Sequence, residues 1–374
     1  MSLLRSCLSA LRGAGFLVVF TLLLVLLLEL GADARRIVAV GDLHGDYEQS
    51  VSVLRLTGLV DSSTHWIGED AFLVQLGDIL DVGPDDIKIV ELLMRLQGEA
   101  RARGGDVVEL LGNHELRNFR GDYTAVDQTS LAASGGKEGR DRLLSNATEV
   151  GKYLRTRKAI FHYGPFLFMH GGFSTATASM ITSLKRVEDF NTELSEALMN
   201  GTISPLASDG LDLSEEDVDV ANPILVRSIL KVKCNDLDKV LKKKFPGIDS
   251  VVVGHVPHDP RDFDGWSLCN GRLLDIDFGM SRWKKGDPGH VAALEIEEAT
   301  WHVQLIETSS TLGPITTVDL TASDAVTAHH LLRLSMLIVG IVVLVFLTVY
   351  CVPFRSSAEQ EPLLDWPATS YGAA

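Results

Sequence analysis

The sequence is poor in basic residues, in cysteine and in aromatic residues. Its 374 residues contain 34 Lys and Arg against 50 Asp and Glu, which gives a formal net charge of −16, and no basic stripe runs along the chain. A nucleic-acid partner is therefore not expected, because binding to a phosphate backbone needs clustered positive charge. Hydrophobic residues, in contrast, make up 46% of the chain, which is ample for a sizeable core. Length alone allows more than one domain, but the motifs below are spread over most of the chain and favour a single large one.

Five short glycine-containing blocks carry residues that are typical metal ligands. In chain order they are Gly41–Gly45, Gly77–Asp81, Gly112–Glu115, His170–Gly172 and Gly254–His255. Each follows a short apolar run that predicts a buried central strand, and these runs are Arg36–Val40, Ala71–Leu76, Val107–Leu111, Phe166–Met169 and Ser250–Val253. Polar residues just past the carboxyl ends of such strands gather in one crevice. The candidate ligands are Asp42, His44, Asp78, Asn113, His170 and His255. This set suits two adjacent divalent cations, which split phosphate esters by clamping both the attacking and the leaving oxygen.

Each block taken alone has a plainer explanation. A single Asp after a strand is more often a helix cap or a turn residue, and a pair such as His170-Gly171 is usually just a turn. Five such blocks in this order are hard to explain in that way. Mn, Fe and Zn accept mixed nitrogen and oxygen ligands, whereas a calcium site rarely uses so many histidines. We therefore expect two divalent ions of Mn, Fe or Zn.

The blocks resemble those of the phosphoprotein phosphatase superfamily of metallophosphoesterases, in particular its Shewanella-like phosphatase branch. Three features carry the resemblance: Asp46 after Gly45, the run Leu-Leu-Gly-Asn-His-Glu that ends at Glu115, and Ile-Asp-Phe-Gly-Met-Ser over 276–281. It spans roughly residues 36–307. The resemblance implies a calcineurin-like metallophosphoesterase fold, an α/β (α+β) architecture in which a two-sheet β-sandwich is flanked by helices.

The resemblance also implies a role for each candidate. Asp42 and His44 correspond to ligands of the first metal, and Asp78 to the carboxylate that bridges both metals. The ligands of the second metal correspond to Asn113, His170 and His255. A metal-bridging hydroxide is then expected to attack phosphorus, so that no covalent serine or cysteine intermediate is needed.

His114 and Asp81 correspond to the general acid of the family and to the carboxylate that orients it. An imidazole held in this way can protonate the departing alkoxide. The implied function is hydrolysis of phosphomonoesters on Ser, Thr or Tyr of proteins. Two alternatives stay open: a hydrolase of small phosphates or dinucleoside polyphosphates, and an inactive receptor-like binding protein. The intact His114 and Asp81 argue against the inactive form, since a binding protein needs no acid.

Two positions distinguish this chain among related enzymes. Many nucleases and purple-acid-type enzymes have a second histidine two residues after the Gly-His pair, where this chain has Pro257, and His258 is predicted to be a rim or loop residue. The superfamily commonly places an arginine directly after the carboxylate of the second block, where its guanidinium grips the substrate phosphate. This chain has Val82 there. Candidates for the missing cation are Arg227, which we favour, and Arg117 and Arg120.

The remaining periodicity predicts flanking elements. Apolar residues recur at helical spacing over 85–102, and 47–56 is predicted to be a second helix capped by Asp46. The runs 272–276, 291–296 and 302–306 alternate between apolar and polar residues. We expect these later strands to form the second sheet, with the metals at one sheet edge.

Both ends of the chain have targeting patterns. Residues 1–34 combine Arg5 and Arg12 with a short apolar run and end in Ala32-Asp33-Ala34, which predicts a signal peptide, with an uncleaved anchor as the alternative. The catalytic domain is assigned to 35–308 and a Ser/Thr-rich stalk to 309–333. Residues 334–352 are almost entirely apolar and long enough to cross a hydrocarbon core of about 30 Å. They predict one transmembrane helix rather than a buried core helix, followed by a short cytosolic tail at 353–374.

This arrangement predicts a single-pass type I membrane protein with a lumenal or extracellular catalytic domain. Asn146 and Asn200 each begin a glycosylation acceptor sequence. The tail segment 359–364 resembles an acidic dileucine signal for endosomes or lysosome-like organelles. Of the four cysteines, only Cys234 and Cys269 fall in the catalytic domain, where an oxidising lumen would allow them to pair.

Overall fold

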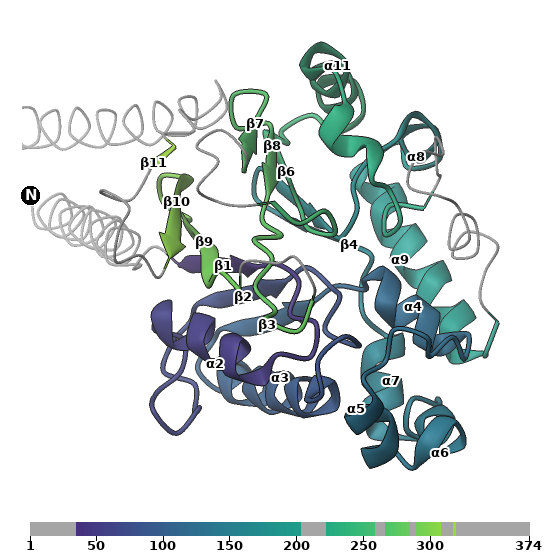
Figure 1. Cartoon of the computed structure of the whole chain (residues 1–374). Helices are drawn as coiled ribbons and strands as arrows, with labels where there is room; N and C mark the ends of the chain where they lie inside the picture. Colours follow the sequence, from purple (N-terminus) through teal and green to yellow (C-terminus); the bar gives the residue numbers. More distant parts are fainter. Residues whose placement is uncertain (1–34, 203–221, 259–265, 285–288, 308–316, 319–374) are drawn as a thin grey trace, which may run out of the picture. The chain divides into compact units, whose positions relative to one another are not determined.

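The computed structural model describes residues 35–202, 222–258, 266–284, 289–307 and 317–318. Two β-sheets carry the chain, and helices cover their outer faces (Figure 1). The first sheet has the order β11-β10-β9-β1-β2-β3. Its members are β1 (Arg36–Val40), β2 (Phe72–Gln75), β3 (Asp106–Glu109), β9 (Ala292–Glu297), β10 (His302–Glu307) and β11 (Thr317–Val318). The pairs β1–β2 and β2–β3 are parallel, whereas β9 joins β1 in the antiparallel direction.

The second sheet has the order β4-β5-β6-β8-β7. Its members are β4 (Ile160–Tyr163), β5 (Phe166–Met169), β6 (Ser250–Val253), β7 (Ser267–Leu268) and β8 (Leu273–Asp275). The central strands β5, β6 and β8 run parallel, and the edge strands β4 and β7 are antiparallel to their neighbours. Parallel central strands bring their carboxyl ends to the same side of the sheet.

Both faces of each central strand are buried, which explains why these strands read as continuous apolar runs. Ile37 and Ala39 of β1 share a core cluster with Phe166 and Phe168 of β5, so this cluster lies between the two sheets. Alternate side chains point to the opposite face of a strand. Val38 accordingly belongs to a second cluster, under the helices. The result is a four-layer arrangement of helix, sheet, sheet and helix.

The helices fill the outer layers and the end of the sandwich. Those among the described residues are α2 (Tyr47–Leu56), α3 (Asp86–Arg101), α4 (Asn113–Phe119), α5 (Gln128–Ala133), α6 (Gly136–Leu143), α7 (Glu149–Arg155), α8 (Thr175–Met180), α9 (Leu184–Met199), the 3₁₀ helix η1 (Ser228–Lys231) and α11 (Cys234–Lys244). The helices predicted over 47–56 and 85–102 are confirmed as α2 and α3. Asp46 caps α2 as expected, because its side chain accepts a hydrogen bond from the backbone N–H of Gln49.

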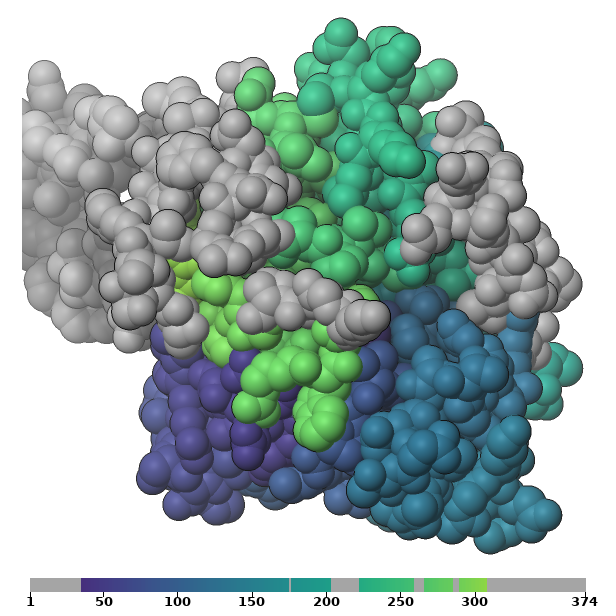
Figure 2. Space-filling model, in the orientation of Figure 1, coloured from purple at the N-terminus to yellow at the C-terminus, as the bar shows by residue number. Residues whose placement is uncertain are grey.

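The prediction that the later strands form the second sheet is wrong in part. β9 and β10 extend the first sheet beside β1, whereas β8 lies in the second sheet beside β6. Figure 2 shows light-green residues from this late part of the chain next to purple residues from its beginning. Alternating polarity reports which face of a strand is buried, but it does not report which strand is its neighbour. Sheet membership therefore had to come from the tertiary structure.

In the part of the chain that the structure describes, no helix is long and apolar enough to cross a bilayer. The predicted signal peptide at 1–34, the predicted transmembrane helix at 334–352 and the tail lie outside the described residues. Within the predicted stalk, only residues 317–318 are described, and they pair with β10 as strand β11.

Candidate metal centre

All five blocks converge at the carboxyl ends of strands from both sheets. Asp42 and His44 follow β1, Asp78 follows β2, and Asn113 begins α4 after β3. The second sheet contributes His170 after β5 and His255 after β6. The site therefore lies where the two sheets meet. The sequence had predicted a site at the edge of one sheet, and this prediction is wrong.

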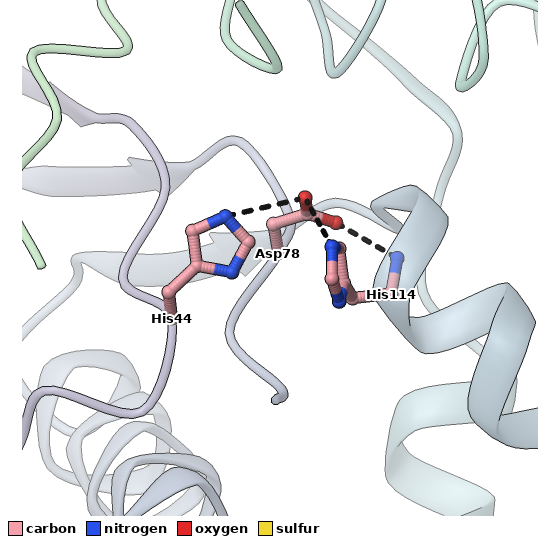
Figure 3. A group of neighbouring side chains, drawn as sticks. All are labelled: His44, Asp78 and His114. Carbon is pink, nitrogen blue, oxygen red and sulfur yellow. Dashed lines mark hydrogen bonds and ion pairs between the residues drawn. The ribbon is translucent and has the colours of Figure 1, made fainter. Parts of the chain in front are cut away.

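Asp78 is the centre of the cluster. Its Oδ2 lies 3.6 Å from His44 Nε2 and 3.9 Å from His114 Nε2, so the two imidazoles flank one carboxylate (Figure 3). Its Oδ1 accepts a hydrogen bond of 2.9 Å from the backbone N–H of His114. The carboxylate is buried, with 2% of the residue exposed. Asp78, for which the sequence predicts the bridging role, is thus a buried carboxylate with an imidazole on each of two sides.

His170 and Asn113 face each other on the other side of Asp78. His170 Nε2 lies 3.4 Å from Asp78 Oδ1 and 3.1 Å from Asn113 Oδ1. His170 Nδ1 is 2.9 Å from the carbonyl oxygen of Leu76, which can only accept, so the proton sits on Nδ1. In the neutral form of the ring, which is the form that binds a metal, the lone pair of Nε2 then faces the amide oxygen of Asn113. Two acceptors directed at each other are suited to sharing a cation, and the carbonyl behind the ring is the usual support of a ligating histidine.

His255 completes this second group. Ligand atoms of Asp78, His170 and His255 all lie within 4.8 Å of one another, as do those of Asp78, His44 and His114. The His170 and His255 ring centroids are 4.7 Å apart. The backbone N–H of His255 donates to Asp42 Oδ1 at 3.2 Å. The structure thus brings together every ligand that the sequence predicted, from five separate loops.

The glycines beside the ligands are required by space. A Cβ at Gly112 would lie 2.1 Å from Asp78 Oδ1, and one at Gly254 would lie 2.6 Å from Asp42 Oδ1. The ligands themselves are held in an uncommon backbone conformation, with φ of 42° at His44, 53° at Asp78 and 74° at His255. Such conformations cost free energy and cluster where a site must be pre-organised.

Glu115 holds the Asp78 turn in place. It is fully buried, and its two carboxylate oxygens accept hydrogen bonds from the backbone N–H groups of Asp78, Ile79, Leu80 and Gly112, at 2.7 to 3.0 Å. One side chain therefore fixes the loop of the second block against that of the third. In the sequence, Glu115 is only the last residue of the Leu-Leu-Gly-Asn-His-Glu run, and nothing there indicates this role.

The electrostatics of the cluster fit cations. Burial lowers the pKa values of His44 and His255 well below the ordinary value of histidine, so both rings are neutral and able to coordinate. Burial, with the nearby carboxylates of Asp277 and Asp78, raises the pKa of Asp42 well above its usual range. Asp42 Oδ2 is also buried without a hydrogen-bond partner. Crowded, underbonded carboxylates of this kind are stabilised by a bound divalent ion.

His114 and Asp81 form the predicted pair. His114 Nδ1 lies 2.8 Å from Asp81 Oδ2, and Asp81 is fully buried. Burial alone would lower the pKa of His114, but the carboxylates of Asp78 and Asp81 outweigh it and raise that pKa. The imidazole therefore holds its proton more readily than a free histidine does, as a general acid must.

A buried polar network that the sequence analysis missed supports Asp81. Asn118 Nδ2 donates to Asp81 Oδ1 at 2.7 Å, and Arg140 Nη2 lies 3.3 Å from the same oxygen. Arg140 is 0% exposed and also donates to Asp86 Oδ2 at 2.6 Å, to Asn118 Oδ1 and to Ser130 Oγ. Arg140 belongs to α6 and lies near none of the motifs in sequence, so no local pattern marks it. Asn118, one helical turn after His114 on α4, could have been found from its i, i+4 spacing.

The arginines proposed for substrate binding differ in their surroundings. Arg117 forms an ion pair with Asp122, with Nη2 2.8 Å from Asp122 Oδ2, and it also donates a hydrogen bond to Thr124 Oγ1. Arg227 is exposed, and its charge is one of the influences, after burial and His170, that lower the pKa of His255. Arg227 therefore lies close enough to the centre to affect it. A role for either arginine in substrate binding stays a prediction.

The segment before Arg227 packs directly on the fourth block. The carbonyl oxygen of Pro223 accepts hydrogen bonds from the backbone N–H groups of Gly171 and Gly172, at 2.9 and 2.8 Å. His258, predicted to be a rim or loop residue, lies on the loop after β6 with Nδ1 3.2 Å from Asp275 Oδ2. Neither contact was visible in the sequence.

The two cysteines and the two glycosylation acceptors of the predicted catalytic domain are among the described residues. Cys234 and Cys269 form a disulfide, which confirms their predicted pairing. Asn146 and Asn200, the predicted glycosylation acceptors, are both exposed. The side-chain amide of Asn146 donates to the carbonyl oxygen of Met199, so the two acceptor sites are neighbours on the surface.

Comparison with known proteins agrees with this architecture. A profile of the calcineurin-like phosphoesterase family matches residues 35–259, more than half of the chain. Shewanella-like protein phosphatase 2 of Arabidopsis thaliana is 26% identical over 294 residues, which cover 66% of this chain and 72% of the plant protein. Shewanella-like protein phosphatase 1 of Plasmodium berghei is 28% identical over 257 residues, which cover 66% and 67%.

The fold also matches solved structures. A cold-active protein-tyrosine phosphatase of a psychrophilic Shewanella species aligns with a TM-score of 0.63 at 23% identity, covering 76% of this chain and 81% of that structure. At this level of identity the likeness concerns the fold. Together with the sequence matches, it confirms the resemblance that the five blocks indicated.

Proposed function

Because the chain belongs to the calcineurin-like phosphoesterase family, we propose that it is a two-metal phosphatase that hydrolyses phosphomonoesters, with phosphoproteins as its substrates. One observation carries the proposal: the His114–Asp81 pair at 2.8 Å lies beside a buried cluster of metal-type ligands centred on Asp78. A site that only bound phosphate would need the cations but not a proton donor.

The metal ligands would be Asp42 and His44 on one side, Asn113, His170 and His255 on the other, and Asp78 between them. When bound, the two divalent ions supply a hydroxide nucleophile at neutral pH and neutralise charge on the phosphate oxygens. The protein contributes geometry: Glu115 fixes the Asp78 turn, and the Leu76 carbonyl fixes the His170 ring.

His114 would protonate the leaving oxygen. Its Nδ1 proton is engaged by Asp81, so the proton available for transfer is the one on Nε2, which points toward Asp78. Transfer breaks the Nε2–H bond and forms the O–H bond of the released alcohol. Asp81 Oδ1 accepts hydrogen bonds from Asn118 and Arg140, which leaves Oδ2 directed at the His114 ring. Its part is to orient the ring and to stabilise its charged form.

The substrate class is supported by the relatives. Two of them, from Arabidopsis thaliana and Plasmodium berghei, are named as protein phosphatases and align with two thirds of this chain. The choice between Ser/Thr and Tyr does not follow from these names. A panel of phosphopeptides and nucleotides, tested on the full-length protein loaded with Mn, Zn or Fe, checks the proposal. We expect phosphopeptide hydrolysis to dominate; preferential cleavage of nucleotides or dinucleoside polyphosphates would contradict it.

We further propose that this catalytic domain lies outside the cytosol of a single-pass type I membrane protein. The Cys234–Cys269 disulfide supports an oxidising compartment, since disulfides persist there and are rare in the cytosol. The two exposed Asn-X-Thr acceptors are compatible with it. Protease protection of the domain in intact membrane vesicles, combined with a mass shift on deglycosylation, tests this topology; digestion of the domain from the cytosolic side would contradict it.

A further inference from the structure

The chain lacks the cation that related enzymes place directly after the carboxylate of the second block. Position 82 is a valine with a φ of 66°, a left-handed conformation that is strained for a β-branched residue. Its backbone N–H is bonded to the carbonyl oxygen of Ala125, so the loop keeps its course without the arginine side chain. A phosphomonoester brings about two negative charges near neutral pH. It would approach a centre that already contains the carboxylates of Asp42, Asp78 and Asp277, all buried.

Lys284 brings a positive charge to this centre from a different part of the chain. Its Nζ lies 3.5 Å from Nε2 of His44. Burial is the main influence on the pKa values of Asp42 and Asp277 and raises both, and the Lys284 ammonium opposes that rise in each carboxyl. The charge of Lys284 therefore acts on two carboxylates and one imidazole of the candidate centre.

The loop that carries Lys284 is anchored to the same segment as the ligands. Arg282 makes a bidentate pair with Asp46, with Nε 2.9 Å from Oδ2 and Nη2 2.7 Å from Oδ1, and its backbone N–H donates to the same carboxylate. Ser281 Oγ donates to the carbonyl oxygen of His44 at 3.1 Å. Lys284 is thus held beside the first block, and its approach to His44 is built into the fold.

The arginines near the centre interact with groups outside the first block. The Arg140 guanidinium is fully buried and paired with Asp81 and Asp86, and Arg117 is paired with Asp122. The charge of Arg227 acts on His255, a candidate ligand of the second metal. Lys284 is therefore placed to act on the side of the first block.

We propose that Lys284 binds the phosphate of the substrate and takes the part for which the chain has no arginine at position 82. This inference deepens the proposed function and rests on it. An ammonium binds phosphate as a point charge with rotatable donors, whereas a guanidinium binds through two fixed parallel hydrogen bonds. The site would therefore accept a phosphate dianion without imposing the single orientation that a bidentate arginine imposes.

The test is direct binding of inorganic phosphate to the full-length, Mn-loaded protein by titration calorimetry. Lys284→Met should weaken phosphate binding by about tenfold to a hundredfold, the usual range for loss of a hydrogen bond to a charged group. Lys284→Arg should keep most of the affinity. The matched control is Lys185→Met, since Lys185 is an exposed residue of α9 paired with Asp189, and it should bind as the wild type does. In hydrolysis of p-nitrophenyl phosphate, Lys284→Met should raise KM more than it lowers kcat.

Metal content distinguishes phosphate binding by Lys284 from the alternative, in which the ammonium affects the binding of metal at His44. Elemental analysis should find the same Mn content in Lys284→Met as in the wild type. Unchanged phosphate affinity in Lys284→Met, or a changed metal content, would overturn the inference. If phosphate binding depends on Lys284 but no phosphoester is hydrolysed, the proposed function fails while the phosphate site stands. If phosphoesters are hydrolysed but Lys284→Met binds phosphate as the wild type does, the proposed function stands and the inference about Lys284 fails.

Discussion

The two sides of the candidate centre satisfy their buried polar atoms in opposite ways. Around Asp81, the carboxylate oxygens are bonded to His114, Asn118 and Arg140, and Arg140 is itself bonded to Asp86. Around Asp42, in contrast, carboxylates crowd one another, and Asp42 Oδ2 has no hydrogen-bond partner. Buried polar groups are normally satisfied, so a buried set that the protein leaves underbonded marks a place for a ligand. The network around Asp81 therefore holds His114 in place, and the carboxylates around Asp42 are suited to binding cations.

This contrast predicts that the metal side can be altered with a loss of activity but little loss of folding. Replacing Asp78 or His255 with Ala should abolish hydrolysis of p-nitrophenyl phosphate, because the bridging carboxylate or a ligand of the second group is removed. Both variants should stay soluble and lose bound metal on dialysis, as measured by elemental analysis. Activity retained by either variant would falsify the two-metal assignment.

The support side should behave in the opposite way. Arg140→Met leaves the buried carboxylates of Asp81 and Asp86 without their cation, and breaking such a pair costs about 3–5 kcal/mol. Urea unfolding measures the loss of free energy of unfolding. The control is Arg186→Met, which removes an exposed pair with Glu193 and should cost less than about 1 kcal/mol. Equal costs for the two variants would mean that the network is not a structural support.

His114 lies on the boundary between the two sides, and its replacement distinguishes acid from ligand. His114→Ala should lower turnover by about a hundredfold or more, the usual contribution of a positioned general acid. Metal content should stay nearly unchanged, because the replacement removes none of the six candidate metal ligands. Loss of metal together with activity would make His114 a ligand and move the acid elsewhere.

The smallest expected effect is a gain in the stability of the metal-free protein. Asp42→Asn removes one charge from a buried site where Asp277 and Asp78 also repel it, so in EDTA the variant should be more stable than the wild type by about 1 kcal/mol. In saturating Mn the order should reverse, because only the wild type gains the full stabilisation of bound metal. Thermal unfolding in both buffers checks this. A variant less stable than the wild type in EDTA would show that Asp42 is part of the support.

Much of the site could be read from the sequence because local patterns encode it. Gly-Asp, Gly-Asn-His-Glu and Gly-His blocks after apolar runs identified Asp42, Asp78, Asn113 and His255, and the structure brings all of them together. Strand ends are local features, and so are the glycines that each tight turn requires. The helices over 47–56 and 85–102 were equally readable from their periodicity.

Only the tertiary structure could decide which distant residues meet. The pairing of β9 with β1, the contact of Arg140 with Asp81 and the approach of Lys284 to His44 join positions between 59 and about 260 residues apart, and none leaves a local trace. The candidate ligands of this protein could therefore be predicted from the sequence alone, since coordination chemistry restricts the residue types. The residues that hold the ligands in place and the cations beside them, such as Arg140 and Lys284, were decided by packing. Any suitably placed polar side chain can supply a hydrogen bond or a charge, so the sequence does not mark which one does.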